Sequence, residues 1–402
     1  MSEWSALARR LDRGGPVALA TVVATEGSAY RRPGAWMAVS QDGAREGLLS
    51  GGCLEADVVE RALRALASGQ PALVTYDTRD PDDVVWGLGM GCQGIVRIWI
   101  EPLSGERLAR TAAFFFEVAG VSDDAMIVTL CGAEREDSSG GGSVRAPAGR
   151  ALVGREGLLR TTDAFPGKIA STDALREETA RRARERLADG DGPGIETIGG
   201  ARVAFTPVSS RIRLLLCGAG DDAVPLARLA ADLDWSVVLA DHRPAWALPD
   251  RFPGARVEPV PAGFDLGPLL PAPHCRTAAV VMTHNIERDV QWAAALLPLE
   301  LGYLGLLGPK RRGEQILEAA RSLAGGQSRP LRVVTPIGLD IASETPKEIA
   351  VAIVAEISAV LSGASGGPLS ERETPIHAAS SARKTPIQED EARVRRGPRN
   401  PA

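Results

Sequence analysis

The sequence predicts an α/β protein in which an N-terminal α+β domain precedes a doubly wound parallel sheet. From about residue 211 onward strands and helices alternate, which is typical of a parallel sheet with helices on both faces. The first strand of this alternation, Ile212–Cys217, is an unbroken apolar run, as expected for a strand buried on both sides. We expect domains at 1–210 and 211–362, and a disordered tail at 363–402 that is rich in Ser, Gly, Pro and charge.

The composition is that of an ordinary folded protein. Of 402 residues, 24% are charged and 44% are hydrophobic, which excludes collagen, coiled coil and global disorder. A net charge of −5 without a long basic run argues against binding to nucleic acid or to a membrane surface. Five cysteines, an odd number, do not suggest a disulfide framework. With no signal peptide or apolar span in view, we expect a cytoplasmic protein with reduced thiols.

The first segment combines helices and strands. An amphipathic helix opens the chain, and Val17–Ala24 is predicted as a strand. Trp36–Ser40 is a second strand. Apolar residues at helical spacing predict a helix over Leu54–Ala67, and a strand over Gly94–Glu101 closes the segment.

The middle segment resembles a weaker copy of the first and suggests an internal duplication. Strands are predicted at Ile127–Leu130, Arg150–Gly157 and Gly200–Val208, with a helix over Asp173–Asp189. The alternative is a coincidence of short strands. The copy lacks both glycine-cysteine loops of the first segment.

The third segment supplies the parallel sheet. Its last helix opens with the capping box Thr345-Pro346-Lys347-Glu348, which has Pro at the first helical position. The further strands are predicted at Ser236–Ala240, Ala278–Thr283 and Tyr303–Leu307, and the helices at Val224–Leu233, Arg288–Leu297 and Arg312–Leu323.

A dinucleotide-binding fingerprint lies between the first strand and first helix of this sheet. Gly218, Gly220 and Ala223 form Gly-x-Gly-x-x-Ala, and Asp241 ends the next strand, where a carboxylate binds a ribose hydroxyl. The segment is therefore Rossmann-like. Asp221 and Asp222 place negative charge where a pyrophosphate would lie, although acids at a helix start also complement the dipole. The alternative is a Rossmann-like domain without its usual ligand.

Two further groups follow later strands of the same sheet. His284 comes directly after the third strand, at the edge where ligands bind. Lys310 and Arg311 follow a glycine turn at the start of a helix and suit an anion. The alternatives are a histidine that caps or packs, and a solvated charge run.

Two glycine-rich loops carry cysteines in the first segment. Cys53 follows Gly51 and Gly52 at the start of a helix, where the dipole favours the thiolate. Cys92 lies in Gly87–Gly94, whose four glycines are costly to order and hard to explain by packing. The pattern is not Cys-x-x-Cys and the segment has no His, so a closed zinc site is not expected. Two thiolates suit sulfur or a thiolate-binding metal centre; the alternative is two buried structural cysteines. The other cysteines, Cys131, Cys217 and Cys275, are expected in cores.

At this point the motifs, taken together, resemble one known family. They are Thr25–Ala35, Ser50–Glu55, Gly87–Gly94, Gly218–Gly220, Asp241–Pro244, Met282–Asn285, Gly305–Gly308, Pro336–Ile341 and Glu344–Ala350. By these motifs the chain is similar to the xanthine dehydrogenase accessory family, XdhC/CoxI, over about Val17–Leu361.

The resemblance implies a maturation factor rather than a metabolic enzyme, with no catalytic residues. Such proteins bind the molybdenum cofactor (molybdopterin), protect its sulfurated form and help insert it into a xanthine dehydrogenase-type molybdenum hydroxylase. They act beside a cysteine desulfurase and are often homodimers. By the same resemblance Cys53 and Cys92 contact the molybdenum or its exchangeable sulfur, and the pterin phosphate or nucleotide lies near Gly218–Gly220 and Lys310–Arg312. The candidate cofactor-binding residues are Gly51, Gly52, Cys53, Glu55, Gly89, Gly91, Cys92, Gly218, Gly220, Asp241, His284, Lys310 and Arg311, with Cys53 and Cys92 as metal ligands.

Two other functions stay open. One is an NAD(P)-dependent oxidoreductase that uses the Rossmann-like domain, with a hydride acceptor near His284. It leaves the loops of Cys53 and Cys92 unexplained. The other is an interaction scaffold with two vestigial sites. A shared ligand of Cys53 and Cys92 requires a fold that brings their loops together.

Overall fold

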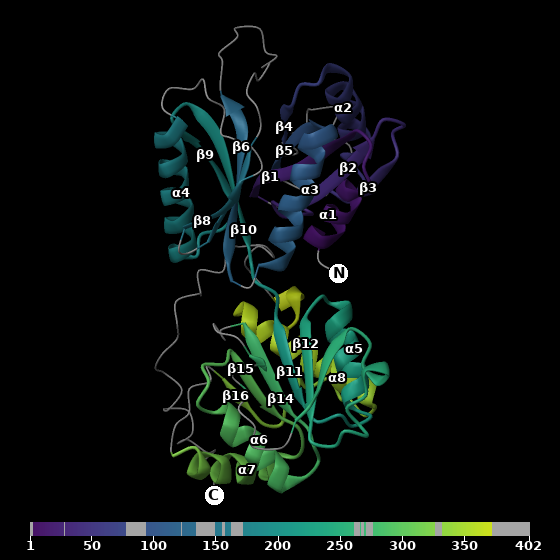
Figure 1. Ribbon diagram of the computed structural model, residues 1–402, viewed down its shortest axis with the longest axis vertical. Coiled ribbons are helices and arrows are strands. Elements are labelled where there is room, and N and C mark those ends of the chain that lie inside the picture. The colour runs from purple at the N-terminus through teal and green to yellow at the C-terminus, as the bar shows by residue number, and fades with distance from the viewer. Residues whose placement is uncertain are drawn as a thin grey trace, which may run out of the picture.

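The chain folds into three β-sheets, which are arranged in an upper and a lower half (Figure 1). Two five-stranded sheets, A and B, form the upper half, and the six-stranded sheet C forms the lower half. The computed structural model describes residues 3–27, 29–77, 94–121, 123–133, 149–154, 157–161, 172–260, 266, 269–270, 276–325 and 332–371.

Sheet A has the strand order β3-β2-β1-β5-β4, and its described pairs are antiparallel. One face of the sheet is covered by α2, which contributes Val58 and Ala62 to a core with Ala18 and Ala20 of β1. The elements are α1 (Glu3–Asp12), β1 (Val17–Gly27), β2 (Trp36–Ser40), β3 (Arg45–Gly47), α2 (Glu55–Ser68), β4 (Ala72–Asp77) and β5 (Gly94–Leu103).

Sheet B repeats this plan. Its order, β8-β7-β6-β10-β9, matches that of sheet A strand for strand, and α3 and α4 hold the places of α1 and α2. The matching strand order supports the predicted internal duplication. The elements are α3 (Gly105–Gly120), β6 (Ala125–Ala133), β7 (Arg150–Gly154), β8 (Gly157–Thr161), α4 (Thr172–Asp189), β9 (Gly194–Ile198) and β10 (Ala201–Val208).

Sheets A and B pack against each other through a common hydrophobic core. A large cluster joins α1 and α3 to both sheets through Leu11, Leu19, Phe115 and Ile127, and α1 lies beside α3 in Figure 1. A buried ion pair also crosses from one sheet to the other: Arg150 of β7 pairs with Glu101 of β5. The two copies therefore form one packed unit rather than two independent domains.

Sheet C is a six-stranded parallel sheet of order β13-β12-β11-β14-β15-β16. This is the strand order of a doubly wound dinucleotide-binding fold, with its switch point between β11 and β14. The elements are β11 (Arg213–Cys217), α5 (Ala223–Asp232), β12 (Ser236–Asp241), η1 (Pro249–Arg251), β13 (Ala255–Pro259), β14 (Thr277–Val281), α6 (Ile286–Leu296), β15 (Tyr303–Leu306), α7 (Lys310–Leu323), β16 (Val333–Val334), α8 (Pro346–Ser362) and η3 (Leu369–Glu371).

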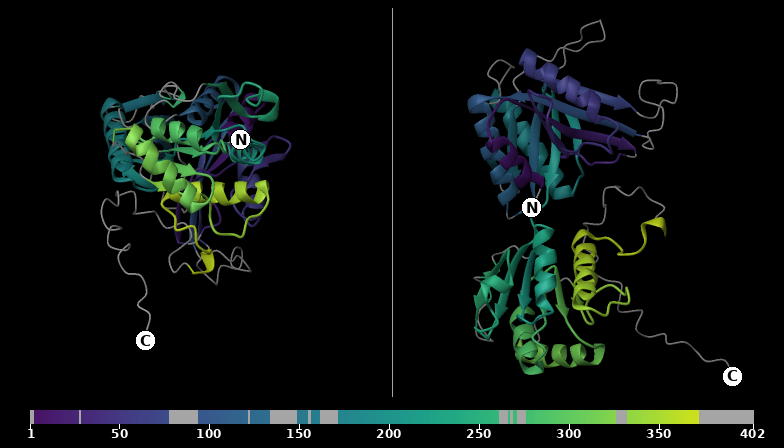
Figure 2. Two further views of the ribbon diagram at one scale, coloured as in Figure 1. Left: turned by 90° about the horizontal axis from the view of Figure 1, so that it is seen from below. Right: turned by 90° about the vertical axis from the view of Figure 1, so that its right-hand side faces the viewer.

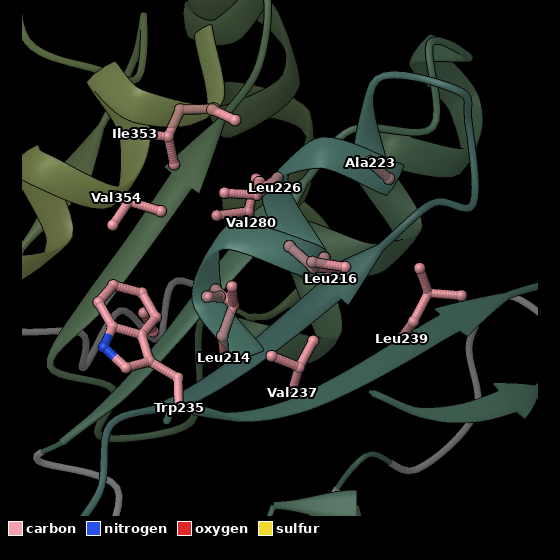
Figure 3. Close-up of a cluster of buried hydrophobic side chains, with 14 of the residues drawn as sticks. Leu214, Leu216, Ala223, Leu226, Trp235, Val237, Leu239, Val280, Ile353 and Val354 are labelled. Atoms are coloured by element: carbon pink, nitrogen blue, oxygen red, sulfur yellow. The ribbon is translucent and has the colours of Figure 1, made fainter. Parts of the chain in front are cut away.

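Both faces of sheet C are buried, which explains the unbroken apolar sequence of β11. Leu214 and Leu216 face α5 and α8, where they meet Leu226 and Ile353 (Figure 3). The alternate residue Leu215 belongs to the core on the other face, under α6 and α7. The predicted capping box is also present, because Thr345 and Glu348 exchange hydrogen bonds at the start of α8.

The segment between β10 and β11 joins the two halves at the amino ends of the parallel strands. Arg211 donates to Ser5 of α1 and pairs with Asp234, which precedes β12. Arg276, just before β14, donates to the Ser210 carbonyl. The carboxyl edge of sheet C is the opposite end, so it points away from this junction; Figure 2 shows the two halves from another side.

The predicted tail begins inside the described chain. Gly363 caps α8 in a left-handed conformation, and the short helix η3 follows it. Residue 371 is the last one that the structure describes. The remainder of the tail lies outside the described residues. Within the described ranges, no helix is both long and apolar enough to cross a membrane.

Candidate functional site

One end of sheet A gathers three loops. Gly27, where β1 ends, pairs with Gly94, where β5 begins, and Asp77 of β4 pairs with the adjacent Ile95. Gly47 of β3 lies at this same end, because it pairs with Met37 near the start of β2. The chain therefore leaves this end three times: between β1 and β2, between β3 and α2, and between β4 and β5. The last two connections contain Cys53 and Cys92.

The loop before α2 is organised by a buried carboxylate. Glu55 is 1% exposed, and its Oε1 accepts the backbone N–H groups of Leu49 (3.2 Å) and Ser50 (2.8 Å). The Ser50 hydroxyl donates to Glu55 Oε2 at 2.5 Å. Burial would raise the pKa of Glu55, but the bonds from Ser50 and Leu49 outweigh it, so the pKa lies below its ordinary value. Glu55 thus holds the loop; its predicted contact with a cofactor stays a prediction.

Cys53 projects from this fixed loop and is exposed. Its Sγ lies 3.5 Å from Ser50 Oγ, which also accepts the N–H of Gly52. Gly52 has φ +110°, a conformation that favours glycine, and the space beside its Cα is open. Tyr30 lies next to the loop: a Cβ on Gly51 would come within 3.7 Å of its ring, yet Tyr30 is 58% exposed. The loop therefore presents a thiol, an aromatic ring and open backbone together.

A hydrogen bond ties α2 to the strand that leads into the second cysteine loop. The Tyr76 hydroxyl donates to Asp57 Oδ2 at 2.6 Å, and Arg61 donates to the same oxygen at 2.5 Å. Tyr76 is the penultimate residue of β4, and Asp57 lies in the first turn of α2, just after Cys53. The chain thus enters the second loop close to the first. The predicted site residues Gly89, Gly91 and Cys92 lie outside the described residues.

At the carboxyl edge of sheet C, Asp241 is fully buried, and both oxygens of its carboxylate accept hydrogen bonds from the protein itself. Oδ2 accepts the Ala219 N–H at 2.6 Å and the Arg243 guanidinium at 2.7 Å. Oδ1 accepts the Arg243 backbone N–H at 2.8 Å and its Nε at 3.0 Å. Gly218 is required beside this carboxylate, because a Cβ there would lie 2.7 Å from the Met282 carbonyl oxygen.

His284 lies across the turn from Asp222. Its Nε2 is 2.7 Å from Asp222 Oδ2, and its φ of +62° is rare for a residue other than glycine. The side chain of His284 is 63% exposed and lies near Gly220. The pair bridges the loops that follow β11 and β14, at the switch point of the sheet.

The three cations of the α7 start do not act as one group. Lys310 and Arg311 are exposed. Arg312 turns inward, where it donates to Asp289 at 2.5 Å and to the Leu307 carbonyl at 3.0 Å. Asp289 is fully buried and also accepts the Thr283 hydroxyl at 2.6 Å. Arg312 therefore fixes the loop of His284 and leaves Lys310 and Arg311 as the accessible cations.

The predicted residues thus fall into two groups in different halves of the molecule. Cys53 precedes α2 in the upper half, whereas Gly220, Asp241, His284 and Lys310 lie at the carboxyl edge of sheet C in the lower half (Figure 1). The structure brings the strand ends that bound the three loops of sheet A together but does not place Cys53 beside the fingerprint turn. Within the described ranges, no group of three or more His, Cys, Asp and Glu side chains could hold a metal ion.

The remaining described cysteines behave as core residues. Cys131 and Cys217 are buried, and burial raises the pKa of both thiols, that of Cys131 to about 12. Their predicted place in cores is confirmed, while Cys275 lies outside the described residues. Three residues that the structure makes important have no role in the sequence-based prediction: Ser50, Tyr30 and Asp289. Ser50 and Tyr30 lie inside the family motifs, so the sequence could have indicated their importance. Asp289 could not be found in this way, because its contact with Arg312 joins residues far apart in the chain.

Comparison with known proteins matches both halves to one family. Residues 10–77 match the XdhC and CoxI family, and residues 214–357 match the XdhC Rossmann domain. The first range contains Cys53, and the second contains the fingerprint turn and His284. The chain is 33% identical over 341 residues to a Bacillus subtilis protein named as a probable subunit of xanthine dehydrogenase, and the match covers 84% of this chain and 91% of that one.

The chain is also similar to two more distant proteins, one curated sequence and one solved structure. The "Molybdenum cofactor insertion chaperone PaoD" of Escherichia coli is 22% identical over 343 residues, covering 85% of this chain and 82% of that one. A crystal structure described as a xanthine dehydrogenase from Bacillus halodurans superposes with a TM-score of 0.65 at 25% identity, covering 93% of this chain and 98% of the other.

Proposed function

Because the chain belongs to the XdhC and CoxI family, we propose that it is an accessory protein that binds the molybdenum cofactor and delivers it to a xanthine dehydrogenase-type molybdenum hydroxylase. The observation that carries this proposal is the exposed thiol of Cys53, held in an open glycine loop by the buried Glu55 carboxylate. The likeness to a molybdenum cofactor insertion chaperone supports the choice of cargo.

The chemistry of this loop suits molybdenum carried on a pterin. A thiolate is a soft ligand, and soft ligands bind thiophilic metal centres. Cys53 is expected to supply that ligand. The exposed Tyr30 ring beside Gly51 offers a platform for a planar heterocycle, since aromatic rings stack on one another. Cys92 is proposed as a second sulfur ligand, because its loop leaves sheet A at the end that carries Cys53.

Glu55 and Ser50 are positioning residues in this account. Ser50 Oγ accepts hydrogen bonds from the backbone N–H groups of Gly52 (3.3 Å) and Leu54 (3.2 Å). One hydroxyl therefore holds two backbone groups of the loop. These bonds within the loop leave the Cys53 side chain exposed. A preformed site loses less conformational entropy on binding than a flexible loop does.

The finer steps follow from the family and are part of the proposal. The protein is expected to shield the sulfurated form of the cofactor, to receive sulfur through a cysteine desulfurase and to act in the cytoplasm as a homodimer. The alternative, an NAD(P)-dependent oxidoreductase, requires an open dinucleotide site at the carboxyl edge of sheet C. The internal bonds of Asp241 and Asp222 oppose that alternative.

The test is cofactor binding by the purified full chain. Released pterin is measured by fluorescence and molybdenum by mass spectrometry, for wild type, Cys53→Ser and Cys92→Ser. The matched control is Cys131→Ala, which removes a buried thiol of β6. We expect stoichiometric binding by the wild type and the control and a loss of at least about tenfold in affinity for Cys53→Ser. A folded wild type that binds no cofactor would refute the proposal.

A further inference from the structure

The lower half has the strand order and glycine turn of a dinucleotide-binding fold. The residues at its carboxyl edge show whether a dinucleotide could bind there. Such a ligand needs three things of the protein. A carboxylate after the second strand must accept the ribose hydroxyls, the turn must face the pyrophosphate, and the crevice at the switch point must be open.

The carboxylate that would accept the ribose hydroxyls, that of Asp241, already accepts hydrogen bonds from the protein. Asp241 has no exposed surface, and its two oxygens accept four N–H groups from Ala219 and Arg243. The Arg243 guanidinium lies where a ribose would offer its hydroxyls, and it stacks over Trp246 at 4.8 Å from the ring centroid. Burial would raise the pKa of Asp241, but the bonds from Arg243 and Ala219 outweigh it and lower the pKa. A charged, saturated carboxylate has no lone pair to offer a ribose.

The turn is also closed on itself. The Ala219 N–H goes to Asp241, and its carbonyl accepts from Arg251 at 2.9 Å. Arg251 also pairs with Asp221 at 2.7 Å and donates to the Trp246 carbonyl at 2.8 Å. This guanidinium is therefore committed to protein groups, among them the Asp221 carboxylate, and not to a phosphate.

The two loops at the switch point are bridged by a pair of side chains. Asp222 Oδ1 lies against Gly220, in the space where a side chain of that glycine would begin, and Asp222 Oδ2 reaches His284 at 2.7 Å. A pyrophosphate entering here meets a carboxylate and must first separate this pair. Like charges at such close range repel strongly even with solvent screening.

We infer that the Rossmann-like half is closed to NAD(P) because its own side chains occupy both subsites, Arg243 in place of the ribose and the Asp222–His284 pair in place of the pyrophosphate. This inference does not depend on the proposed function. It predicts that the fold serves here as a scaffold and that no dinucleotide lies along the fingerprint turn in the manner of NAD.

Titration of the full-length protein with NADH, NAD⁺ and NADP⁺, followed by NADH fluorescence and by calorimetry, tests this. We expect no saturation of the wild type up to about 1 mM nucleotide. The variant Asp222→Ala/Arg243→Ala opens both subsites and is expected to bind NADH at least about tenfold more tightly than the wild type. The control Asp250→Ala/Arg256→Ala removes an exposed acid and an exposed arginine of the same half and is expected to behave as the wild type.

Because Arg243→Ala leaves a buried carboxylate with fewer donors, the double variant can fail to fold. Asp222→Ala alone covers that case, since it leaves only the exposed His284 without its partner, and it is expected to gain a smaller affinity for NADH. Saturable binding of any of the three nucleotides by the wild type would overturn the inference. So would folded opened variants that bind no more NADH than the control pair.

Discussion

The hydroxyl of Tyr76 donates a 2.6 Å hydrogen bond to Asp57 Oδ2, which links the end of β4 to the first turn of α2. The bond joins the two chain segments that lead to the candidate cysteines, since Asp57 follows Cys53 closely and Tyr76 precedes the loop of Cys92. The bond therefore fixes the point where the chain leaves β4 next to the start of α2. Burial and the Asp57 carboxylate together raise the pKa of Tyr76, so the phenol stays a donor at any physiological pH.

Removal of this link is expected to cost stability. Tyr76→Phe deletes only the hydroxyl and leaves Asp57 with Arg61, so we expect a loss of about 1–2 kcal/mol in the free energy of unfolding. Urea unfolding measures it. Arg64→Ala is the control on the same helix, because Arg64 and Glu60 form an exposed pair and such pairs contribute less than about 0.5 kcal/mol. Equal effects of the two substitutions would contradict this reading.

The buried carboxylate of Glu55 predicts a pH dependence of stability. Its folded pKa lies below the unfolded value of about 4.3, so its contribution is fully present above that pH and is lost as the pH falls through the folded pKa. Glu55→Gln is expected to destabilise the protein by about 1–3 kcal/mol at pH 7, and by less as the pH falls below the unfolded pKa and through the folded one. Urea unfolding at several pH values measures the difference from wild type.

The matched control for that series is Glu60→Gln, an exposed glutamate on the same helix. Its effect is expected to stay small at every pH. A Glu55→Gln penalty that stays constant from pH 7 to well below the unfolded pKa would show that the carboxylate charge does not hold the loop.

The fold divides the described thiols into one reactive and two protected groups. A short pulse of iodoacetamide on the native protein is expected to label Cys53 quickly, because it is exposed. Cys131 and Cys217 should react only after unfolding, because burial blocks the reagent and raises their pKa. Peptide mass spectrometry with and without urea gives the result. Native labelling of Cys217 as fast as Cys53 would be inconsistent with the structure.

The ion pair between Glu101 and Arg150 is expected to be needed for the joint core of sheets A and B. Both side chains are almost fully buried, and Arg150 also lies over the Phe115 ring. Arg150→Ala leaves a buried carboxylate with less compensation and should cost about 3–5 kcal/mol in urea unfolding. Arg110→Ala, at an exposed pair with Glu106 on α3, should cost less than about 1 kcal/mol. A cost of Arg150→Ala as small as that of the exposed pair would disprove this role.

The sequence is informative where the signal is local. The apolar run of β11, the capping box of α8 and the repeated order of short strands all rest on neighbouring residues, and each is present in the fold. Helix α3 is absent from the prediction, although its buried residues Leu108, Ala112, Phe115 and Val118 have the spacing of an amphipathic helix, so the sequence does carry a signal for it. The edge strands β4 and β9 are also absent from the prediction; they are only six and five residues long and give a weak signal.

The site is less predictable because its key contacts are long-range. The motif around Cys53 is visible in the sequence, but the burial of Glu55 beneath it is not. The pattern favours Asp222 as a complement to the helix dipole, whereas its carboxylate meets His284, which is remote in the chain. Asp241 has the spacing of a ribose ligand, yet Arg243 fills the position, and no pattern of residue types distinguishes a free carboxylate from an occupied one.

The most direct test of the proposed function is the sulfur coordination of molybdenum in the complex. Full-length protein loaded with the molybdenum cofactor is examined by X-ray absorption at the molybdenum K-edge, as wild type and as Cys53→Ser, with Cys131→Ala as the control. We expect a molybdenum–sulfur contribution from the protein that is present in the wild type and the control and is reduced in Cys53→Ser. Identical sulfur coordination in all three proteins would contradict it, because the Cys53 thiol would then not be a ligand.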